Sequence, residues 1–416
     1  MSDNKNFKPE SLMMSYGYQP ELSVGSIKCP IYQTSTFTFP NAEFGKRLFS
    51  VAYGLEEPEI NEPQGLIYSR LNNPDLQILE ERLTLWDNAE AGAVFDSGMA
   101  AITTVLLEFL KPGDTLLCST PTYGGTDHFI NHILDKFQIN ALWFQAGASE
   151  EEIRSIVEES GKKDSLRLIY IETPANPTNA LIDIQMCRKL ADEFGGEETV
   201  YLAVDNTYMG PIWSNPIDHG ADLVLYSATK YIGGHSDVIA GACLGSAALI
   251  QRVKIMRTFL GNMADAWTGW LLMRSLETLK VRMEAQAKGA EVVAEFLKNH
   301  PKVEKVYYLG FIEKSHSDYA IYQRQYSSAG AMLSFDIKGG EKEAFTFLNN
   351  LKLIKLAVSL GGTESLAQHP YSMTHADVDS ETKNRNSVTE KLIRISVGIE
   401  NPEDLVFDMS QSLEKV

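Results

Sequence analysis

Seven short apolar runs alternate with helix-like segments between residues 92 and 246, and this alternation limits the folds open to the chain. The runs are GAVFDSG, TLLCSTP, ALWFQAG, LRLIYIETP, TVYLAVDNT, ADLVLYS and VIAGACLGS. Several are continuously apolar, as strands buried on both faces are. Between them, segments such as AAITTVLLEFL and IQMCRKLADEF repeat apolar residues every three or four positions, as helices that cover a sheet do. The pattern predicts an α/β domain with a mostly parallel, seven-stranded sheet.

The remaining sequence predicts two further parts. Residues 264–300 carry a long helical pattern, which predicts one connecting helix. Beyond it, the strand-like VEKVYY, AMLSFDI and RISVGI alternate with helix-like segments, which is typical of a smaller α+β domain. The beginning of the chain has aromatic and turn residues but little periodicity, which suggests an extended arm. We therefore expect an arm (1–72), a large domain (73–281) and a small C-terminal domain (282–416), since 416 residues favour more than one core.

Charge and cysteine content exclude several classes of partner. The chain has 55 acidic and 37 basic residues and a formal net charge of -18, so we expect neither nucleic acid nor an anionic membrane surface as a partner. Cys29, Cys118, Cys187 and Cys243 show no CxxC spacing and the histidines are scattered, which argues against a metal site and favours a reducing cytoplasm. The sequence contains no apolar stretch long enough for a membrane span, and its N-terminal residues do not resemble a signal peptide.

The end of the first predicted strand carries a possible anion site. In α/β sheets, ligands bind at the carboxyl ends of the strands. In DSGMAA (96–101) the strand stops at Ser97, and a helix starts at once at Gly98 and Met99. The free N–H groups of a helix start attract anions, and Gly98 would let a phosphate approach the backbone. Taken alone, this motif is better explained by a tight turn without a ligand.

Two further strand ends carry an acid and a lysine. Asp205, in AVDNTYMGP, could cap a turn, but a buried carboxylate there would also pair with a protonated pyridine nitrogen. In SATK, the hydroxyls of Ser227 and Thr229 suit phosphate oxygens. Lys230 suits an attack on an aldehyde, because burial lowers the pKa of an amine; a surface lysine explains SATK alone equally well. Together the three strand ends indicate one cofactor, pyridoxal 5'-phosphate.

Eight motifs along nearly the whole chain carry a family resemblance. They are YSRLNNPD at 68–75, DSGMAA at 96–101, PTYGGT at 121–126, ETPANPT at 172–178, VDNTYMGP at 204–211, YSATKYIGGHSDVIAG at 226–241, VSLGGTESLAQHPYSMTH at 358–375 and LIRISVGIENPEDL at 392–405. With them the chain resembles the pyridoxal-phosphate enzymes of cysteine and methionine metabolism. That family includes cystathionine γ-synthase, cystathionine γ- and β-lyases, methionine γ-lyase and O-acylhomoserine sulfhydrylases. The resemblance implies an aspartate aminotransferase-like fold (fold type I), with a large domain around the seven-stranded sheet and a smaller C-terminal domain.

The resemblance also implies roles for individual residues. Lys230 would bond to the cofactor's aldehyde and later move protons, and Tyr123 would stack on the ring and act as an acid or base. Asp205 would pair with the ring nitrogen. By role, the residues are catalytic Lys230 and Tyr123; cofactor-binding Tyr68, Arg70, Gly98, Met99, Tyr123, Asn176, Asp205, Ser227, Thr229 and Lys230; and substrate-carboxylate-binding Ser359 and Arg394. Within that set, Asn176 would contact the phenolic oxygen of the cofactor. The phosphate would be contacted by Gly98, Met99, Ser227 and Thr229.

The same resemblance implies an oligomer. Tyr68 and Arg70 match residues that reach into the phosphate site of a neighbouring subunit. A homodimer would then be the smallest active unit, and we expect two such dimers to form a tetramer. The other expected partner is a small-molecule amino-acid substrate.

The expected reaction is γ-elimination or γ-replacement on a sulfur-containing or O-acylhomoserine-type amino acid. Alternatives are β-elimination from cystathionine, which gives pyruvate, and a non-catalytic protein that binds pyridoxal phosphate. Gly125 stands where methionine γ-lyases typically have a cysteine, which favours a cystathionine-type pocket. Ile67 stands where several enzymes acting on cystathionine or cysteine have an acid, and this argues against a cystathionine-type pocket. Asp75, in place of the family's usual threonine, and a long segment at 49–65 also leave the distal specificity open.

Overall fold

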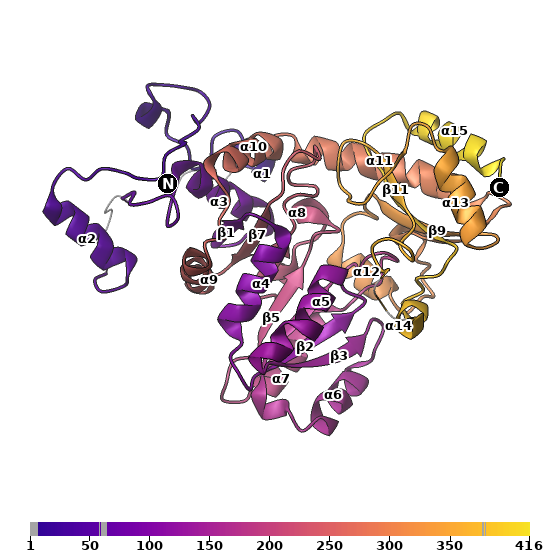
Figure 1. The fold of residues 1–416 in the computed structure, drawn as a ribbon, viewed down its shortest axis with the longest axis horizontal. Helices are drawn as coiled ribbons and strands as arrows, with labels where there is room; N and C mark the ends of the chain where they lie inside the picture. The colour runs from indigo at the N-terminus through magenta and orange to yellow at the C-terminus, as the bar shows by residue number, and fades with distance from the viewer. Residues whose placement is uncertain (1–6, 58, 60–64, 377, 379) are drawn as a thin grey trace.

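The structure is a computed structural model that describes residues 7–57, 59, 65–376, 378 and 380–416, so part of the segment 49–65 lies outside the described residues. Its centre is a seven-stranded sheet in the order β1-β7-β6-β5-β4-β2-β3 (Figure 1). The strands are β1 (Ala91–Phe95), β2 (Thr115–Thr120), β3 (Asn140–Gln145), β4 (Leu166–Glu172), β5 (Tyr201–Asp205), β6 (Leu223–Tyr226) and β7 (Gly241–Gly245). Strand β7 is antiparallel to both neighbours, and the others run parallel to one another. The seven predicted strands and the mostly parallel sheet are confirmed.

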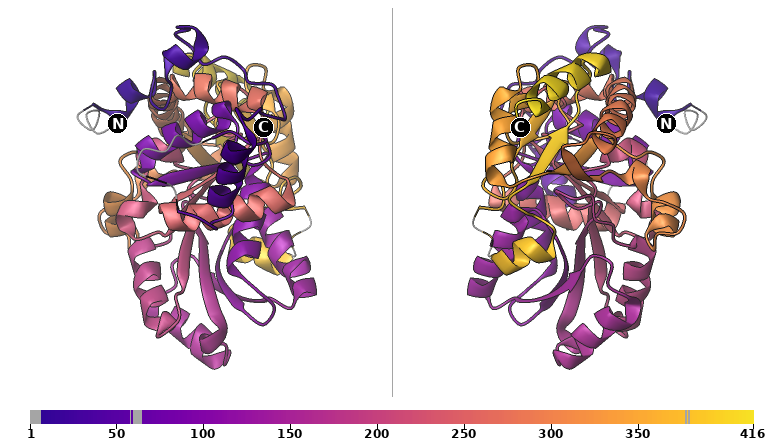
Figure 2. Two further views of the ribbon diagram at one scale, coloured as in Figure 1. Left: turned by 90° about the vertical axis from the view of Figure 1, so that its left-hand side faces the viewer. Right: turned by 90° about the vertical axis from the view of Figure 1, so that its right-hand side faces the viewer.

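Helices cover both faces of this sheet (Figure 2). Along β4 the side chains alternate, so that Leu168 and Tyr170 join one apolar cluster and Ile169 and Ile171 the other. The first cluster is closed by α4 (Gly98–Phe109), α5 (Gly124–His132) and α9 (Ala247–Leu260). The second is closed by α3 (Pro74–Asp87), α6 (Glu150–Glu159) and α7 (Ile184–Gly195), with α8 (Gly210–Trp213) and α10 (Ala266–Leu276) beside α3. Burial on both faces explains why the strand sequences are continuously apolar.

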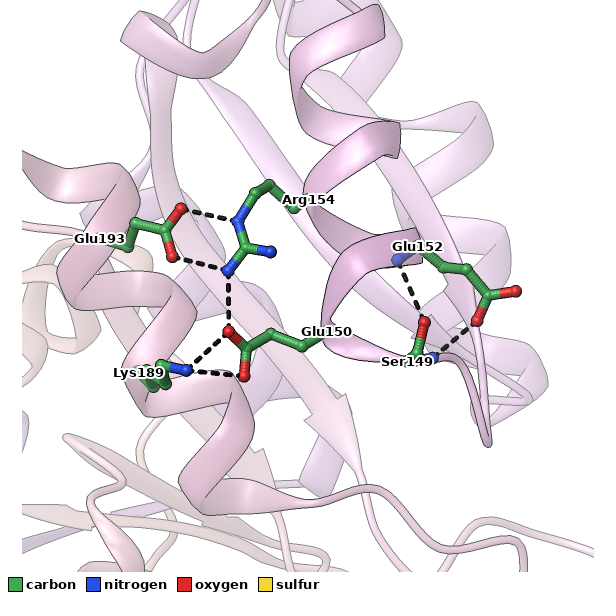
Figure 3. A network of polar contacts seen from close by, with 6 residues as sticks. All are labelled: Ser149, Glu150, Glu152, Arg154, Lys189 and Glu193. Atoms are coloured by element: carbon green, nitrogen blue, oxygen red, sulfur yellow. Dashed lines mark hydrogen bonds and ion pairs between the residues drawn. The ribbon is translucent and has the colours of Figure 1, made fainter.

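The outer surface of α6 and α7 carries a network of charged side chains (Figure 3). Arg154 on α6 forms ion pairs with Glu150 at 2.7 Å and with Glu193 of α7 at 2.8 Å. Lys189 of α7 also contacts Glu150, at 2.7 Å. Helix α6 begins with a capping box in which Ser149 and Glu152 bond to each other's backbone N–H groups. The network therefore joins the two helices on the solvent side.

A second sheet of five strands, in the order β10-β11-β12-β9-β8, forms the core of the C-terminal part. Its strands are β8 (Val303–Tyr307), β9 (Met332–Ile337), β10 (Lys355–Leu356), β11 (Leu366–Gln368) and β12 (Leu392–Ser396). The helices of this part are α11 (Leu279–Lys298), α12 (Tyr319–Gln325), α13 (Glu341–Asn350), α14 (Ser380–Arg385) and α15 (Pro402–Leu413). The expected smaller α+β unit is confirmed.

The single connecting helix expected over 264–300 is wrong, because two helices, α10 and α11, occupy this segment. Helix α10 ends at Leu276, and α11 begins at Leu279. The carbonyl of Ser275 accepts from the N–H of Thr278, three residues later, at 3.2 Å and from the Arg282 guanidinium at 3.0 Å. These two donors satisfy a carbonyl at the end of α10 where the chain turns.

The N-terminal arm is less extended than expected. It contains α1 (Pro9–Leu12) and the eleven-residue helix α2 (Ala42–Ala52), whose first turn is capped by the Asn41 side chain bonding to the N–H of Phe44 at 2.8 Å. Asp75, in the first turn of α3, accepts from the N–H of Tyr32 at 2.7 Å and so fastens the arm to α3. Burial raises the pKa of Asp75 to about 6. Figure 1 places the arm and the C-terminal unit at opposite ends of the molecule. Among the residues described, no helix is long and apolar enough to cross a membrane.

Candidate active site

Lys230 follows β6 of the large sheet and contacts the segment between β10 and β11 of the small sheet. Its Nζ donates a hydrogen bond to Ser359 Oγ at 2.9 Å. Burial, reinforced by the positive charge of Arg394, lowers the pKa of Lys230 from 10.5 to about 8. A substantial fraction of the amine is therefore neutral near physiological pH and can attack a carbonyl carbon.

Arg394 reaches the same place from β12 of the small sheet. It is 4% exposed and donates to Ser359 O at 2.7 Å and to Asn176 Oδ1 at 3.0 Å. Ser359 itself has φ 104°, a conformation in which a non-glycine residue is strained and which recurs at functional sites. Contacts from both Lys230 and Arg394 hold Ser359 in place. The structure thus brings Lys230, Asn176, Ser359 and Arg394 together, and the guanidinium offers a forked donor for a carboxylate.

Two acids lie side by side at the ends of β4 and β5. Glu172 and Asp205 are opposite each other in the strand register, and they are 5% and 7% exposed. Asp205 accepts from the N–H of Thr207 at 3.0 Å and from the Tyr170 hydroxyl at 3.2 Å. Burial raises the pKa of both carboxyl groups, and the charge of Asp205 raises that of Glu172 further. In the described part of the chain, neither acid forms an ion pair with a lysine or arginine.

The start of α4 and Ser227, where the sequence predicts a phosphate site, pack directly against each other. A Cβ added to Gly98 would lie 2.9 Å from the Cβ of Ser227, so only glycine allows this packing. The first backbone hydrogen bond of α4 runs from the N–H of Ala101 to Ser97 O, at 3.2 Å. The N–H groups of Gly98 and Met99 come before it in the chain, so they point out of the start of the helix. This arrangement suits a phosphate group.

Thr229 is arranged differently from Ser227. Its hydroxyl donates to Ala240 O at 3.2 Å and accepts from the Ala240 N–H at 3.0 Å. The Thr229 hydroxyl therefore fastens the lysine loop to the start of β7, and its one proton is directed at a carbonyl.

Tyr123 stands at the start of α5 with its side chain 46% exposed. A Cβ added to Gly125 would lie 2.7 Å from Cε1 of the Tyr123 ring and 3.1 Å from the sulfur of Met99. The ring therefore lies over Gly125, in the space that a side chain at this position would need. Its aromatic face is open to a planar ligand.

Tyr68 and Arg70 are not brought to this group of residues. They lie on the arm, with the Arg70 guanidinium 5.7 Å from the centre of the Tyr68 ring and bonded to Thr258 O of α9 at 3.1 Å. No contact among the described residues joins either side chain to Lys230 or Asp205. Tyr68 is 39% exposed and available to another molecule.

Sequence reasoning missed Glu172, although its position gave a signal. It closes the apolar run LRLIYIE, at a strand end like that of Asp205. It also missed Gln368, which is paired with Arg394 in the strand register and faces its guanidinium. That contact depends on strand pairing between distant segments.

The residues fit pyridoxal phosphate. A buried acid without a cation suits a pyridinium nitrogen, the Gly98 and Ser227 cradle suits a phosphate, and a partly neutral buried lysine suits an aldehyde. Within the described ranges there is no group of histidine, cysteine and acidic residues that could hold a metal ion.

Comparison with known proteins agrees with this assignment. Residues 10–414 match the family model described as Cys/Met metabolism PLP-dependent enzyme. The chain is 39% identical to an L-methionine γ-lyase of Fusobacterium nucleatum subsp. nucleatum, over 94% of each chain. It is 37% identical to a cystathionine γ-lyase of Bacillus subtilis, over 98% of this chain and 100% of that one. A crystal structure of cystathionine γ-synthase from Xanthomonas oryzae pv. oryzae, in complex with aminoacrylate and cysteine, superposes with a TM-score of 0.87 at 32% identity, covering 98% of each chain.

Proposed function

The chain belongs to the pyridoxal-phosphate-dependent enzymes of cysteine and methionine metabolism, and from this premise we propose that it catalyses γ-elimination on a sulfur-containing amino acid. The related reaction is γ-replacement on an O-acylhomoserine-type substrate, in which a thiol takes the place of the leaving group. Relatives named as γ-lyases, at 39% and 37% identity, favour elimination. Because the chain also resembles a cystathionine γ-synthase structure, γ-replacement is the second candidate reaction.

One observation carries this proposal. The Nζ of Lys230 lies 2.9 Å from Ser359 Oγ, and the carbonyl of the same Ser359 is bonded to Arg394. An amino acid whose carboxylate rested on Arg394 and Ser359 would present its Cα to the lysine amine. Lys230 would then take the proton from Cα and return protons at the neighbouring carbons.

The other residues act on binding and protonation. When bound, pyridoxal phosphate withdraws electrons from the substrate's Cα. Asp205 would pair with the protonated pyridine nitrogen, because its buried carboxylate needs a positive partner. Asn176 accepts from Arg394 through its Oδ1 and would contact the phenolic oxygen. Tyr123 would stack on the ring and give a proton to the leaving sulfur.

We propose that the phosphate is bound by Gly98, Met99 and Ser227, with Thr229 at the edge of the cradle, and that Tyr68 and Arg70 complete the cradle of a second copy of the chain. The separation of these two residues from Lys230, and the exposed apolar side chains of the arm such as Leu22 (77%) and Ile27 (85%), support a homodimer, and two dimers would form a tetramer. The four cysteines are buried and unpaired, which supports a cytoplasmic location.

The test is the identity of the 2-oxo acid released from L-cystathionine or L-methionine alone. The proposal expects 2-oxobutanoate. Pyruvate from cystathionine would show that the β-elimination alternative is right. Release of 2-oxo acid from neither substrate, but product formation from an O-acylhomoserine and a thiol, would favour replacement. No turnover with any of them, despite bound cofactor, would favour a non-catalytic binding protein.

A further inference from the structure

Glu172 is a buried acid that no step proposed above uses. It is the last residue of β4 and 5% exposed, and its carboxylate faces polar groups of two separate loops. Burying an unpaired carboxylate is unfavourable, so several contacts must favour its retention here. Those contacts identify what it does.

Glu172 joins the loop after β2 to the loop after β4. One carboxylate oxygen accepts from the N–H of Tyr123 at 2.6 Å and from the hydroxyl of Thr122 at 3.2 Å. The other oxygen accepts from the N–H of Asn176 at 3.0 Å. Thr122 and Asn176 are themselves only 6% and 5% exposed. A single side chain therefore fixes two loops that are about fifty residues apart in the sequence.

We propose that Glu172 is a positioning residue of the cofactor site, which holds the backbone at Tyr123 and at Asn176 and through it places the two side chains relative to each other. Through Asn176 its influence extends further. Asn176 Oδ1 accepts from Arg394 at 3.0 Å and from the Tyr208 hydroxyl at 2.6 Å. The ring that covers the cofactor and the arginine proposed to bind the substrate thus depend on the same carboxylate.

The hydrogen bonds explain why this residue is an acid and not an amide. Both oxygens of Glu172 accept, and all three of its partners are donors. A glutamine has only one oxygen, so its NH₂ group would face an N–H of one loop whichever way it turned.

The test compares Glu172→Gln with Glu80→Gln. Glu80, on α3, is equally buried, accepts from the N–H of Val94 at 3.0 Å and pairs with Lys254 and Arg257, but it touches no residue of the site. Two readouts are taken on the holoenzyme and after cofactor removal and reloading: the dissociation constant for pyridoxal phosphate, and the visible circular dichroism per bound cofactor. Neither uses a substrate, so failure of γ-elimination would leave this test intact.

We expect Glu172→Gln to raise the dissociation constant roughly tenfold, the effect of losing one or two charge-assisted hydrogen bonds, and to reduce the dichroism per bound cofactor. Glu80→Gln should lower the thermal unfolding midpoint and leave both readouts unchanged. Wild-type values in Glu172→Gln, or equal changes in both variants, would overturn the proposal.

If Glu172→Gln does not fold, Thr122 provides the same test at smaller amplitude. Thr122→Val removes one donor to Glu172 and keeps the shape, while Thr122→Ser keeps the donor. The proposal expects weaker dichroism in Thr122→Val and the wild-type signal in Thr122→Ser. Equal signals in the two variants would overturn it.

Discussion

The charged network on α6 and α7 and the acid pair at the ends of β4 and β5 handle charge in opposite ways. On the surface, Glu150 meets both Lys189 and Arg154 at 2.7 Å, and hydrogen bonds from them, that of Lys189 first, hold its pKa below the usual range (Figure 3). In the interior, burial raises the pKa of Glu172 and Asp205, and neither has a lysine or arginine ion pair among the described residues. The surface acids are neutralised by lysine and arginine side chains of the chain, whereas the buried acids accept hydrogen bonds but have no such cation among the described residues.

Whether an acid has a cation partner therefore indicates a candidate active site better than the number of charged residues in a region does. Exposed ion pairs contribute little to stability and carry no chemical task. A buried acid with a perturbed pKa and no cation is unfavourable unless a ligand completes it, and such groups cluster at functional sites. The network in Figure 3 has a cation for each of its linked acids, whereas the acid pair lacks one and is where we propose that the cofactor binds.

Substitution of Lys230 should have the largest effect. Lys230→Ala removes the amine that Ser359 holds, so we expect turnover to fall by about a thousandfold or more. Release of 2-oxo acid by the purified protein measures this. Lys189→Ala, in the surface network, is the matched control and should retain full turnover. Wild-type turnover in Lys230→Ala would refute the assigned mechanism.

Neutralising one acid in each region tests the contrast directly. Asp205→Asn keeps the shape but loses the charge that pairs with a pyridinium, and we expect turnover to fall roughly a hundredfold. Glu150→Gln makes a similar change of charge on α6 and should alter neither turnover nor cofactor affinity. Steady-state rates and pyridoxal-phosphate titrations of both variants measure the difference, and similar losses in the two would contradict it.

The reactivity of Lys230 should depend on pH around its lowered pKa. Below about 8 the amine is mainly protonated and only its neutral minority attacks an aldehyde; as the pH rises through about 8 the neutral fraction increases. We expect the rate of cofactor incorporation into the apoprotein, followed by visible absorbance, to rise with a midpoint near 8. A midpoint above 10 would mean that burial and Arg394 do not act on this lysine.

The sequence was sufficient wherever the signal was local. The seven strands, the glycine at the start of α4, Asp205 and Lys230 each follow from a short apolar run and the residues directly after it. The break between α10 and α11 was missed although it is local, because the helical pattern of apolar residues continues across it. Glu172 was missed because one of its partners, Tyr123, belongs to a loop that is distant in the sequence. The structure places Asp205 and Lys230 after buried strands, but the domain limits and the roles of all the site residues, Asp205, Lys230, Tyr68 and Arg70 included, stay predictions.

Removing Arg154 should have the smallest effect and completes the comparison. Its side chain is 26% exposed, and Arg154→Ala would leave Glu150 paired with Lys189 and return Glu193 to water. Because water and salt already screen such pairs, we expect unchanged turnover and cofactor affinity, and a thermal unfolding midpoint lower by no more than about 1 °C. That small difference should vanish in high salt, which scanning calorimetry at two ionic strengths would detect. A loss of cofactor affinity in Arg154→Ala would mean that α6 and α7 transmit strain to the ends of β4 and β5. The surface network and the buried acid pair would then not be independent of each other, as we propose that they are.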